Sequence, residues 1–208
     1  MEKEKTDKKD HILDVAEKVF SEVGYDGAST RMISGEAGVN MAMLNYYFGS
    51  KEGLFLAIFE RRISMFRDML RDIGNTSGLS PWGKIEKYIE TYVDRIFNNT
   101  CFQRMLYQEI SMSRKGDLPD KINQILTQNV SEFNKLIKEG VDTGDFKPDT
   151  DIEMITATIF GIKNYLMNTP YVSSKMFGYD IQNEESLKIF KPRLKAYLIN
   201  LLKPYLLK

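Results

Sequence analysis

Ser29–Lys51, STRMISGEAGVNMAMLNYYFGSK, predicts two short helices joined by a tight turn. Thr30 is expected to start the first helix, because its hydroxyl can accept a hydrogen bond from a free backbone N–H in the next turn. Gly38 follows, and glycine is the usual residue just past a helix end because it adopts a positive φ without a side-chain clash. Asn40 is a good cap for a second helix over Met41–Phe48. A helix, a glycine-containing turn and a second helix in this order are typical of a DNA-binding helix-turn-helix.

The second predicted helix has one apolar side and one polar side. Leu44 falls on the side that can pack against the first helix, at about 100° per residue. Met41, Ala42 and Asn45 fall on the other side, and Tyr46 borders them. Asparagine can form two hydrogen bonds to adenine, and the alanine methyl group can contact thymine. Each residue alone would also suit an ordinary half-buried surface, but the caps, the glycine and the two sides all agree with DNA recognition.

Lys51 is a candidate phosphate contact. Ser50 is expected to cap the next helix, which places Lys51 in its first turn. A cation there opposes the helix dipole by about 0.3–1 kcal/mol, a cost that the neighbouring Glu52 partly offsets. A bound phosphate would reverse the sign, because free N–H groups at a helix start already form an anion site. The alternative is an exposed lysine that tolerates the dipole.

The segment resembles the N-terminal DNA-binding domain of the TetR (tetracycline repressor) family of bacterial transcription regulators. The resemblance covers about the first quarter of the chain. It is carried by Ile12, Ala16, Phe20, Gly24, Thr30, Ile33, Ala37, Gly38, Val39, Leu44, Tyr47, Phe48, Lys51 and Leu54. Ser34 stands where the family more often has alanine, and Asn45 where it often has tyrosine, so no operator sequence can be carried over.

The resemblance implies a homodimeric, ligand-responsive regulator, most often a repressor that a small-molecule effector releases from a palindromic operator. The fold it implies is all-α, with a three-helix helix-turn-helix domain (1–50) followed by a larger effector-binding and dimerisation domain (51–208). The sequence pattern and the resemblance together give these candidate DNA-binding residues: Thr30, Arg31, Asn40, Met41, Ala42, Asn45, Tyr46, Tyr47 and Lys51.

The charge balance does not mark the chain as a nucleic-acid binder. The 208 residues carry 29 lysines and arginines against 29 aspartates and glutamates. A strongly basic surface, the usual electrostatic sign of nucleic-acid binding, is therefore not expected. We expect phosphate contacts through a few placed groups and helix N-termini, and weak non-specific affinity.

The rare residue types and the N-terminus restrict the other classes. Cys101 is the single cysteine, which excludes an internal disulfide and fits a reducing cytosol. His11 is the single histidine, so the residues for a His-rich metal site are lacking, and no cofactor is expected. The N-terminal MEKEKTDKKD has no apolar region of a signal peptide, and no apolar run approaches the ~18 residues of a membrane span. These features predict a cytoplasmic protein with no membrane partner.

Helical spacing of apolar residues extends along the whole chain, and no strand-like alternation of useful length interrupts it. Thr150 and Glu153 are expected to form a capping box, in which each side chain satisfies a free backbone N–H of the other. The stretch 169–182 is expected to be a loop, and Pro192 to end the first turn of the last helix or kink it. Helices are predicted from about Asp7 or Lys9 to Val23, Ser50 to about Gly74, Ser80 to Ile96, Phe102 to Ile110, Ile122 to Gly140, Thr150 to Leu166 and Leu187 to Leu202, with a polar turn around Lys115–Pro119.

Two further sites are hypotheses about the larger domain. Methionine suits a cavity that must adapt its shape, and the chain has 11 methionines. A pocket for an apolar or aromatic effector is therefore expected among Met65, Phe66, Met69, Phe102, Met105, Phe133 and Tyr165. Ala157 and Gly161, four positions apart, would let two helices approach closely. A dimer interface over the last two long helices is expected to use Ile155, Ala157, Ile159, Gly161, Ile162, Leu194, Leu198 and Leu201.

Two alternative functions remain open. One is a helix-turn-helix regulator controlled by a protein partner, without a small-molecule effector. The other is an enzyme, but Glu86 and Glu90, which lie one turn apart, are surrounded by lysines and indicate a solvated face. A palindromic duplex, a small-molecule effector and a second copy of the chain are therefore the expected partners.

Overall fold

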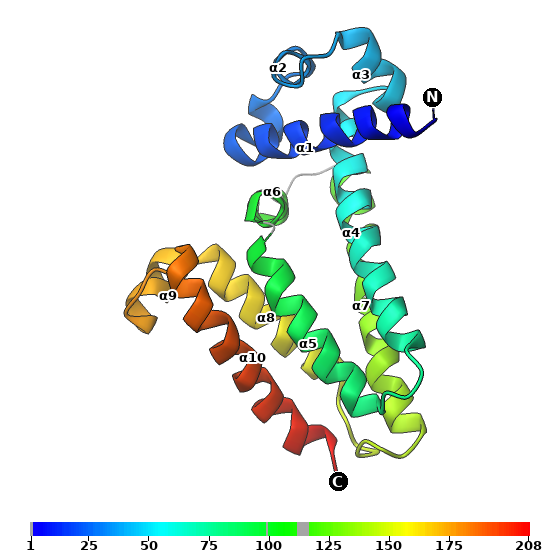
Figure 1. Cartoon of the computed structure of the whole chain (residues 1–208), viewed down its shortest axis with the longest axis vertical. Helices are drawn as coiled ribbons and strands as arrows, with labels where there is room; N and C mark the ends of the chain where they lie inside the picture. The colour runs from blue at the N-terminus through cyan, green and yellow to red at the C-terminus, as the bar shows by residue number, and fades with distance from the viewer. Residues whose placement is uncertain (1, 99, 112–116) are drawn as a thin grey trace. The chain divides into compact units, whose positions relative to one another are not determined.

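The structure is a computed structural model that describes residues 2–98, 100–111 and 117–208, with side chains described at 7–98, 101–109 and 117–208 (Figure 1). The described residues confirm the all-α prediction, and their β pairing is an isolated antiparallel bridge between Phe146 and Leu207. The helices are α1 (Glu2–Gly27), α2 (Thr30–Glu36), α3 (Met41–Phe48), α4 (Lys51–Asn75), α5 (Pro81–Asn98), α6 (Thr100–Ser111), α7 (Asp117–Asp142), α8 (Ile152–Asn168), α9 (Pro170–Phe177) and α10 (Glu184–Leu206).

The chain divides into two compact units. Unit 1 comprises Met1–Met65 and Cys101–Leu126, and unit 2 comprises Phe66–Thr100 and Thr127–Lys208. Each unit has its own cluster of buried apolar side chains, while α4 and α7 each contribute residues to both units. The segment 1–50, which the sequence assigns to the helix-turn-helix domain, lies inside unit 1.

Unit 1 is held together by aromatic packing and by ion pairs between α1 and α4. The Phe55 ring lies edge-on to the Phe20 ring, with ring centroids 4.8 Å apart. Arg62 Nε and Nη2 donate to the two carboxylate oxygens of Glu17 at 2.7 and 2.9 Å. Arg61 Nη2 donates to Asp14 Oδ1 at 2.7 Å. Because Glu17 is almost fully buried, its bidentate ion pair with Arg62 fixes the register of α1 on α4.

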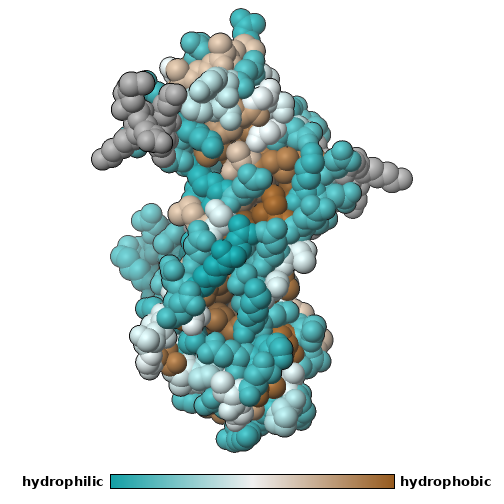
Figure 2. Space-filling model, turned by 90° about the vertical axis from the view of Figure 1, so that its right-hand side faces the viewer, coloured by the Kyte–Doolittle hydropathy of each residue, from teal (hydrophilic) through white to brown (hydrophobic). Residues whose placement is uncertain are grey.

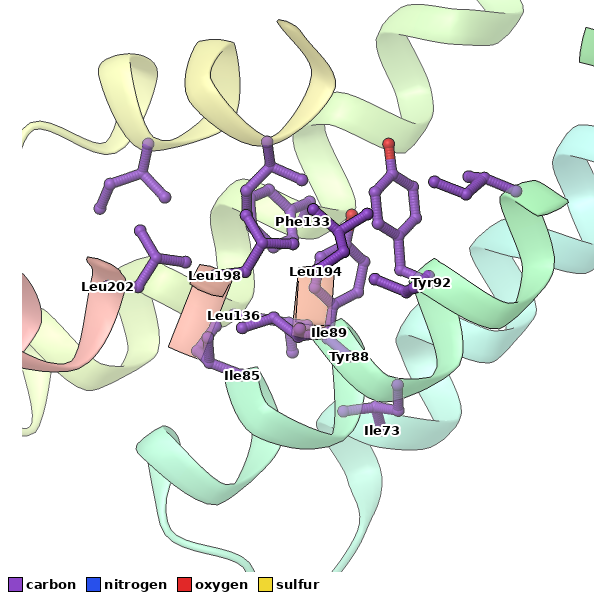
Figure 3. Close-up of a cluster of buried hydrophobic side chains, with 14 of the residues drawn as sticks. Ile73, Ile85, Tyr88, Ile89, Tyr92, Phe133, Leu136, Leu194, Leu198 and Leu202 are labelled. Atoms are coloured by element: carbon purple, nitrogen blue, oxygen red, sulfur yellow. The ribbon is translucent and has the colours of Figure 1, made fainter. Parts of the chain in front are cut away.

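Unit 2 is built on α5, whose apolar side is buried along the whole helix. Figure 3 shows Ile85, Tyr88 and Tyr92 of α5 in one cluster with Phe133 of α7 and Leu198 of α10. The apolar residues that were predicted from their helical spacing on these helices therefore form the buried core of unit 2. The C-terminus closes against the loop after α7, where Lys147 N donates to Leu206 O at 2.8 Å.

Two of the predicted helix caps are wrong by one residue. The cap of α2 is Ser29, whose Oγ accepts from Met32 N at 3.1 Å, and Thr30 is the first helical residue. The cap of α8 is Asp151, whose Oδ1 accepts from Met154 N at 2.9 Å. The Thr150 hydroxyl instead donates to the carbonyl of Lys147 in the preceding turn, so the predicted capping box does not form. In both places two residues that can cap a helix stand side by side, and the pattern alone does not separate them.

Other differences concern helix ends. The predicted loop at 169–182 is wrong over 170–177, where Pro170 occupies the first position of α9 and Gly178 closes it with a left-handed φ of 79°. The helix α10 begins eight residues before Pro192 and continues through it, so the proline does not end its first turn. The helix α1 is longer than predicted, with the expected break at Gly24, where φ is 73°. Most of the predicted turn around Lys115–Pro119 lies outside the described residues, and α7 begins at Asp117.

None of the described helices is both long and apolar enough to cross a membrane. Figure 2 shows the face of the molecule at the right-hand side of Figure 1. Hydrophilic residues cover most of this face, and hydrophobic residues are visible in separate small areas.

Candidate functional site

The turn between α2 and α3 is fixed by backbone hydrogen bonds. Gly38 has a φ of 63°, and its N–H donates to Gly35 O at 3.2 Å. Val39 N donates to Ser34 O at 3.0 Å. This pair of bonds is the Schellman arrangement that closes a helix through a left-handed glycine, as predicted for Gly38. Asn40 Oδ1 accepts from Met43 N at 2.7 Å and caps α3, which is also confirmed.

The two sides of α3 are as predicted. Leu44 is fully buried in the unit 1 cluster, whereas Met41, Ala42, Asn45 and Tyr46 are exposed. These four residues lie within six consecutive positions, about one and a half helical turns, and form a surface that we call the α3 face. Its asparagine and alanine carry the hydrogen-bonding and methyl groups suited to base edges.

The other candidate DNA-binding residues surround the α3 face. Arg31 is exposed and Thr30 is half-buried, both in the first turn of α2. The Asn40 side-chain oxygen is engaged in the cap of α3. Tyr47 is half-buried against the unit 1 cluster, and its ring centroid lies 5.3 Å from that of Tyr46.

Lys51 has partners within unit 1 that the sequence did not suggest. Its Nζ donates to Tyr25 O at 2.9 Å and to Ala28 O at 3.0 Å, and lies 4.3 Å from the centroid of the Tyr25 ring. The ammonium therefore stabilises the carbonyl groups at the end of α1. A phosphate contact of Lys51 remains a prediction, and it would use an ammonium already oriented by these carbonyls.

Sequence reasoning missed two residues that hold the helix-turn-helix. His11 Nε2 donates to Ala37 O at 3.1 Å and so joins α1 to the end of α2, and no signal in the sequence pointed to it. Gly53 is the second: a Cβ atom there would lie 2.1 Å from the carbonyl oxygen of Phe48. A glycine inside a predicted helix was the available signal, because it often marks a close approach.

The residues predicted for an effector pocket are divided between the units. Met65, Phe102 and Met105 belong to unit 1, where Met65 is exposed and the other two are buried. Phe66, Met69, Phe133 and Tyr165 belong to unit 2. Phe66 and Phe133 are buried there, Met69 packs against the cluster, and Tyr165 is exposed. The predicted pocket residues therefore belong to two units and not to one, and the pocket remains a prediction.

Unit 2 has two described cavities. One, of about 460 Å³, is lined mainly by apolar residues of α8, α9 and α10: Gly161, Ile162, Tyr165, Leu166, Met176, Phe177, Phe190, Arg193, Leu194 and Tyr197. The other, of about 570 Å³, is more polar and lies at the ends of α5 and α8 and the start of α10. Tyr165 is the one predicted pocket residue in these linings.

The residues predicted for a dimer interface differ in burial. Ile155, Ile159, Leu194 and Leu198 are buried in the unit 2 cluster of the same chain. Ile162 is half-buried, while Ala157, Gly161 and Leu201 are exposed. Several large apolar side chains of α8, α9 and α10 are also exposed, namely Met154, Tyr165, Tyr171, Val172, Met176, Ile189, Tyr197 and Tyr205. Among the described residues no group of three or more histidine, cysteine, aspartate and glutamate side chains could hold a metal ion.

Comparison with known proteins gives matches in both parts of the chain. Residues 12–58 match the family described as bacterial regulatory proteins, tetR family, and residues 81–191 match the family described as tetracyclin repressor-like, C-terminal domain. The fatty acid metabolism regulator protein of Bacillus subtilis is 26% identical over 160 residues, which cover 76% of this chain and 81% of the relative. The HTH-type transcriptional repressor NicS of Pseudomonas putida is 45% identical over 58 residues, 28% of this chain and 27% of the relative.

Among solved structures, the transcriptional regulator FadR of Bacillus subtilis in complex with stearoyl-CoA has the same fold. The TM-score is 0.69 at 20% sequence identity, and the match covers 91% of this chain and 96% of that one.

Proposed function

Because the chain belongs to the tetR family of bacterial regulatory proteins, we propose that it is a repressor that binds a palindromic operator as a homodimer and leaves it when a small apolar effector binds. At the level of the family, it is a DNA-binding transcription regulator and not an enzyme. The observation that carries the DNA-binding part is the exposed α3 face on a helix whose start and preceding turn are fixed by hydrogen bonds. Such a helix can enter a major groove without reorganising.

Asn45 is expected to read a base, and Tyr47 to contact a phosphate. On a duplex recovered by selection from a random library, Asn45→Ala should weaken binding by about 1–3 kcal/mol and relax the preference at one base pair. Tyr47→Phe should weaken binding to selected and random duplexes alike, because a phosphate contact carries no sequence information. Fluorescence anisotropy measures both. A loss of equal size on selected and random duplexes for Asn45→Ala would remove the base-reading role.

Dimerisation is proposed from the exposed apolar residues of α8, α9 and α10. A palindromic site requires two copies of α3 related by a two-fold axis, with half-sites one or more helical turns apart. Gly161 supplies a specific test, because a Cβ atom there would meet no atom of the described residues within 4 Å. Gly161→Leu should therefore leave the single chain folded while changing the lining of the 460 Å³ cavity and the surface against which a second copy would pack.

Light scattering should give twice the chain mass of 24.1 kDa for the unmutated protein at micromolar concentration. Gly161→Leu should shift the mass towards that of one chain, with unchanged helicity by circular dichroism. A monomer for the unmutated protein would contradict the dimer, and an unchanged dimer for Gly161→Leu would exclude Gly161 from the interface.

The effector is proposed to be an apolar small molecule that binds unit 2. Its support is that unit 2 has cavities of about 460 and 570 Å³ lined in part by apolar residues, together with the similarity to a fatty acid metabolism regulator and to a regulator solved with stearoyl-CoA. A ligand can release DNA only if it binds the DNA-incompetent state more tightly, since it shifts an equilibrium by its differential affinity. At about 100 times its dissociation constant it would add roughly 2.7 kcal/mol of stability, which a thermal-shift screen detects. Compounds that stabilise the protein but leave operator affinity unchanged would contradict a regulatory role, and an empty screen would favour control by a protein partner.

A further inference from the structure

Five aromatic rings from four helices of unit 2 meet in its core. The rings are Phe66 of α4, Tyr88 and Tyr92 of α5, Phe133 of α7 and Phe160 of α8. The centroids of Tyr88 and Tyr92 lie 5.2 Å apart, and Tyr88 lies 4.5 Å from Phe133. Phe160 lies 5.9 Å from Tyr92 and 6.0 Å from Phe133. We call these five residues the ring cluster.

Two hydroxyl groups in the ring cluster are buried without a partner. The hydroxyl oxygens of Tyr88 and Tyr92 have no hydrogen bond to any residue that the structure describes. Figure 3 shows both side chains lying side by side and pointing away from α5, towards α7 and α8. Burial raises the pKa of both tyrosines above the ordinary value, so each keeps its proton and remains a donor. An unsatisfied buried donor costs about 1–3 kcal/mol, which phenylalanine would avoid.

Lys163 adds a cation on the side of α8 that carries Phe160. It follows Phe160 by three positions and Thr156 by seven, which is the spacing of one helix face. Thr156 on that face donates to Asn134 Oδ1 of α7 at 2.6 Å, so the face lies against α7. Lys163 has no hydrogen-bond or ion-pair partner in the described part of the chain, and desolvation lowers its pKa to about 8. At neutral pH it is still mostly charged.

The unpartnered groups gather at one end of the ring cluster. In Figure 1, α5 and α8 run in the same direction and α7 runs in the opposite one. Tyr92 lies one turn after Tyr88, Lys163 lies one turn after Phe160, and Asn129 lies one turn before Phe133. Tyr92, Lys163 and Asn129 therefore all lie towards the same end of the ring cluster. The side-chain oxygen of Asn129 is also buried, with no hydrogen-bond partner among the described residues.

We propose that Lys163 and Tyr92 form the polar end of the effector site and bind the carboxylate of an otherwise apolar molecule. An ammonium and a phenol both donate protons, so the group they bind must be an acceptor, and the ammonium favours an anion. Because the ring cluster is apolar, it disfavours a second charged group on the ligand and favours a ligand whose remaining part is apolar. The cavity of about 570 Å³ is lined in part by Met167, one turn after Lys163, and by Phe97, near the end of α5, so it begins beyond these groups on the side away from the rings. The inference rests on the proposed function, in which unit 2 binds the effector.

Stability and binding are expected to change in opposite directions when these groups are removed. Tyr92→Phe deletes an unsatisfied hydroxyl, and Lys163→Met deletes a desolvated charge while keeping a stem of similar length. Neither variant should lower the melting temperature of the unliganded protein, and both should bind the carboxylate less well. A purely structural role would lower the melting temperature instead. Groups that reduce stability without a ligand are typical of functional sites.

The test is isothermal titration of the full chain with dodecanoate and with dodecan-1-ol, which has the same chain and no charge. The unmutated protein should bind dodecanoate at least tenfold more tightly than the alcohol. Lys163→Met should abolish that difference, and Tyr92→Phe should weaken dodecanoate binding about tenfold. Lys138→Met is the matched control, because Lys138 is an exposed lysine of unit 2, and it should behave like the unmutated protein.

Equal affinity for dodecanoate and dodecan-1-ol would overturn the proposal, as would a Lys163→Met variant that binds dodecanoate normally or melts at a lower temperature. Dodecanoyl-CoA separates a carboxylate from a thioester: tighter binding of the thioester that is insensitive to Lys163→Met would also overturn it. The proposal would also be overturned if the protein bound neither dodecanoate nor 4-phenylbutanoate. Binding to a selected duplex, measured separately, would still support the proposed DNA-binding function in each of these cases.

Discussion

Gly53→Ala is expected to destabilise the DNA-binding region by about 3 kcal/mol and to abolish tight operator binding. The new Cβ atom would lie 2.1 Å from the carbonyl oxygen of Phe48, the last residue of α3. A backbone oxygen cannot turn away as a side chain can, so α3 must move relative to the first turn of α4. That shift would displace the α3 face from the geometry that contacts bases.

Thermal unfolding and fluorescence anisotropy with a selected duplex measure the two effects of Gly53→Ala. Gly35→Ala is the matched control for stability, since a Cβ atom at Gly35 would meet no atom within 4 Å in the described part of the chain. Alanine is favoured over glycine inside a helix by about 1 kcal/mol, so this control should keep or raise the melting temperature. A Gly53→Ala protein that melts and binds DNA normally would show that α3 tolerates the shift.

Arg62→Ala is expected to cost about 3 kcal/mol of stability, the lower end of the range for a buried ion pair that loses one partner. The Glu17 side chain is only 5% exposed, so without Arg62 its carboxylate loses two hydrogen bonds in the unit 1 core and keeps the longer ion pair with Arg61, whose Nη2 lies 3.7 Å from Glu17 Oε2. The Arg62 side chain keeps 22% exposure, which lets water replace part of the interaction. The loss should loosen α1 from α4 and weaken operator binding without removing any DNA contact.

Urea unfolding followed by circular dichroism measures the Arg62→Ala effect. Lys121→Ala is the control, because its pair with Glu52 in the same unit is exposed on both sides, and the change should be too small to resolve. The double variant Glu17→Leu, Arg62→Met should recover most of the stability, since apolar side chains can replace a buried ion pair. A double variant as unstable as Arg62→Ala would mean that the charge left on Glu17 is not the cause.

The sequence by itself determined the helices and the helix-turn-helix, because the interactions that form them are local. The Gly38 turn and the caps of Asn40 and Ser50 use groups no more than five positions apart. The apolar spacing that buries Leu44 is likewise contained in a few turns. Where the same local logic failed, at Thr30 and Thr150, a neighbouring side chain could form the cap equally well.

Only the tertiary structure decided which groups meet from distant parts of the chain. Lys51 finds carbonyls 26 and 23 positions away, and Arg62 finds Glu17 45 positions away. Ile155 and Leu194 carry the same apolar spacing as an interface would, but they are buried because the core of unit 2 closes over them. Periodicity records that a side of a helix is apolar, not what covers it. For the same reason the buried hydroxyls of Tyr88 and Tyr92 could not be predicted, since a tyrosine lacks a partner only when the helices packed around it provide none.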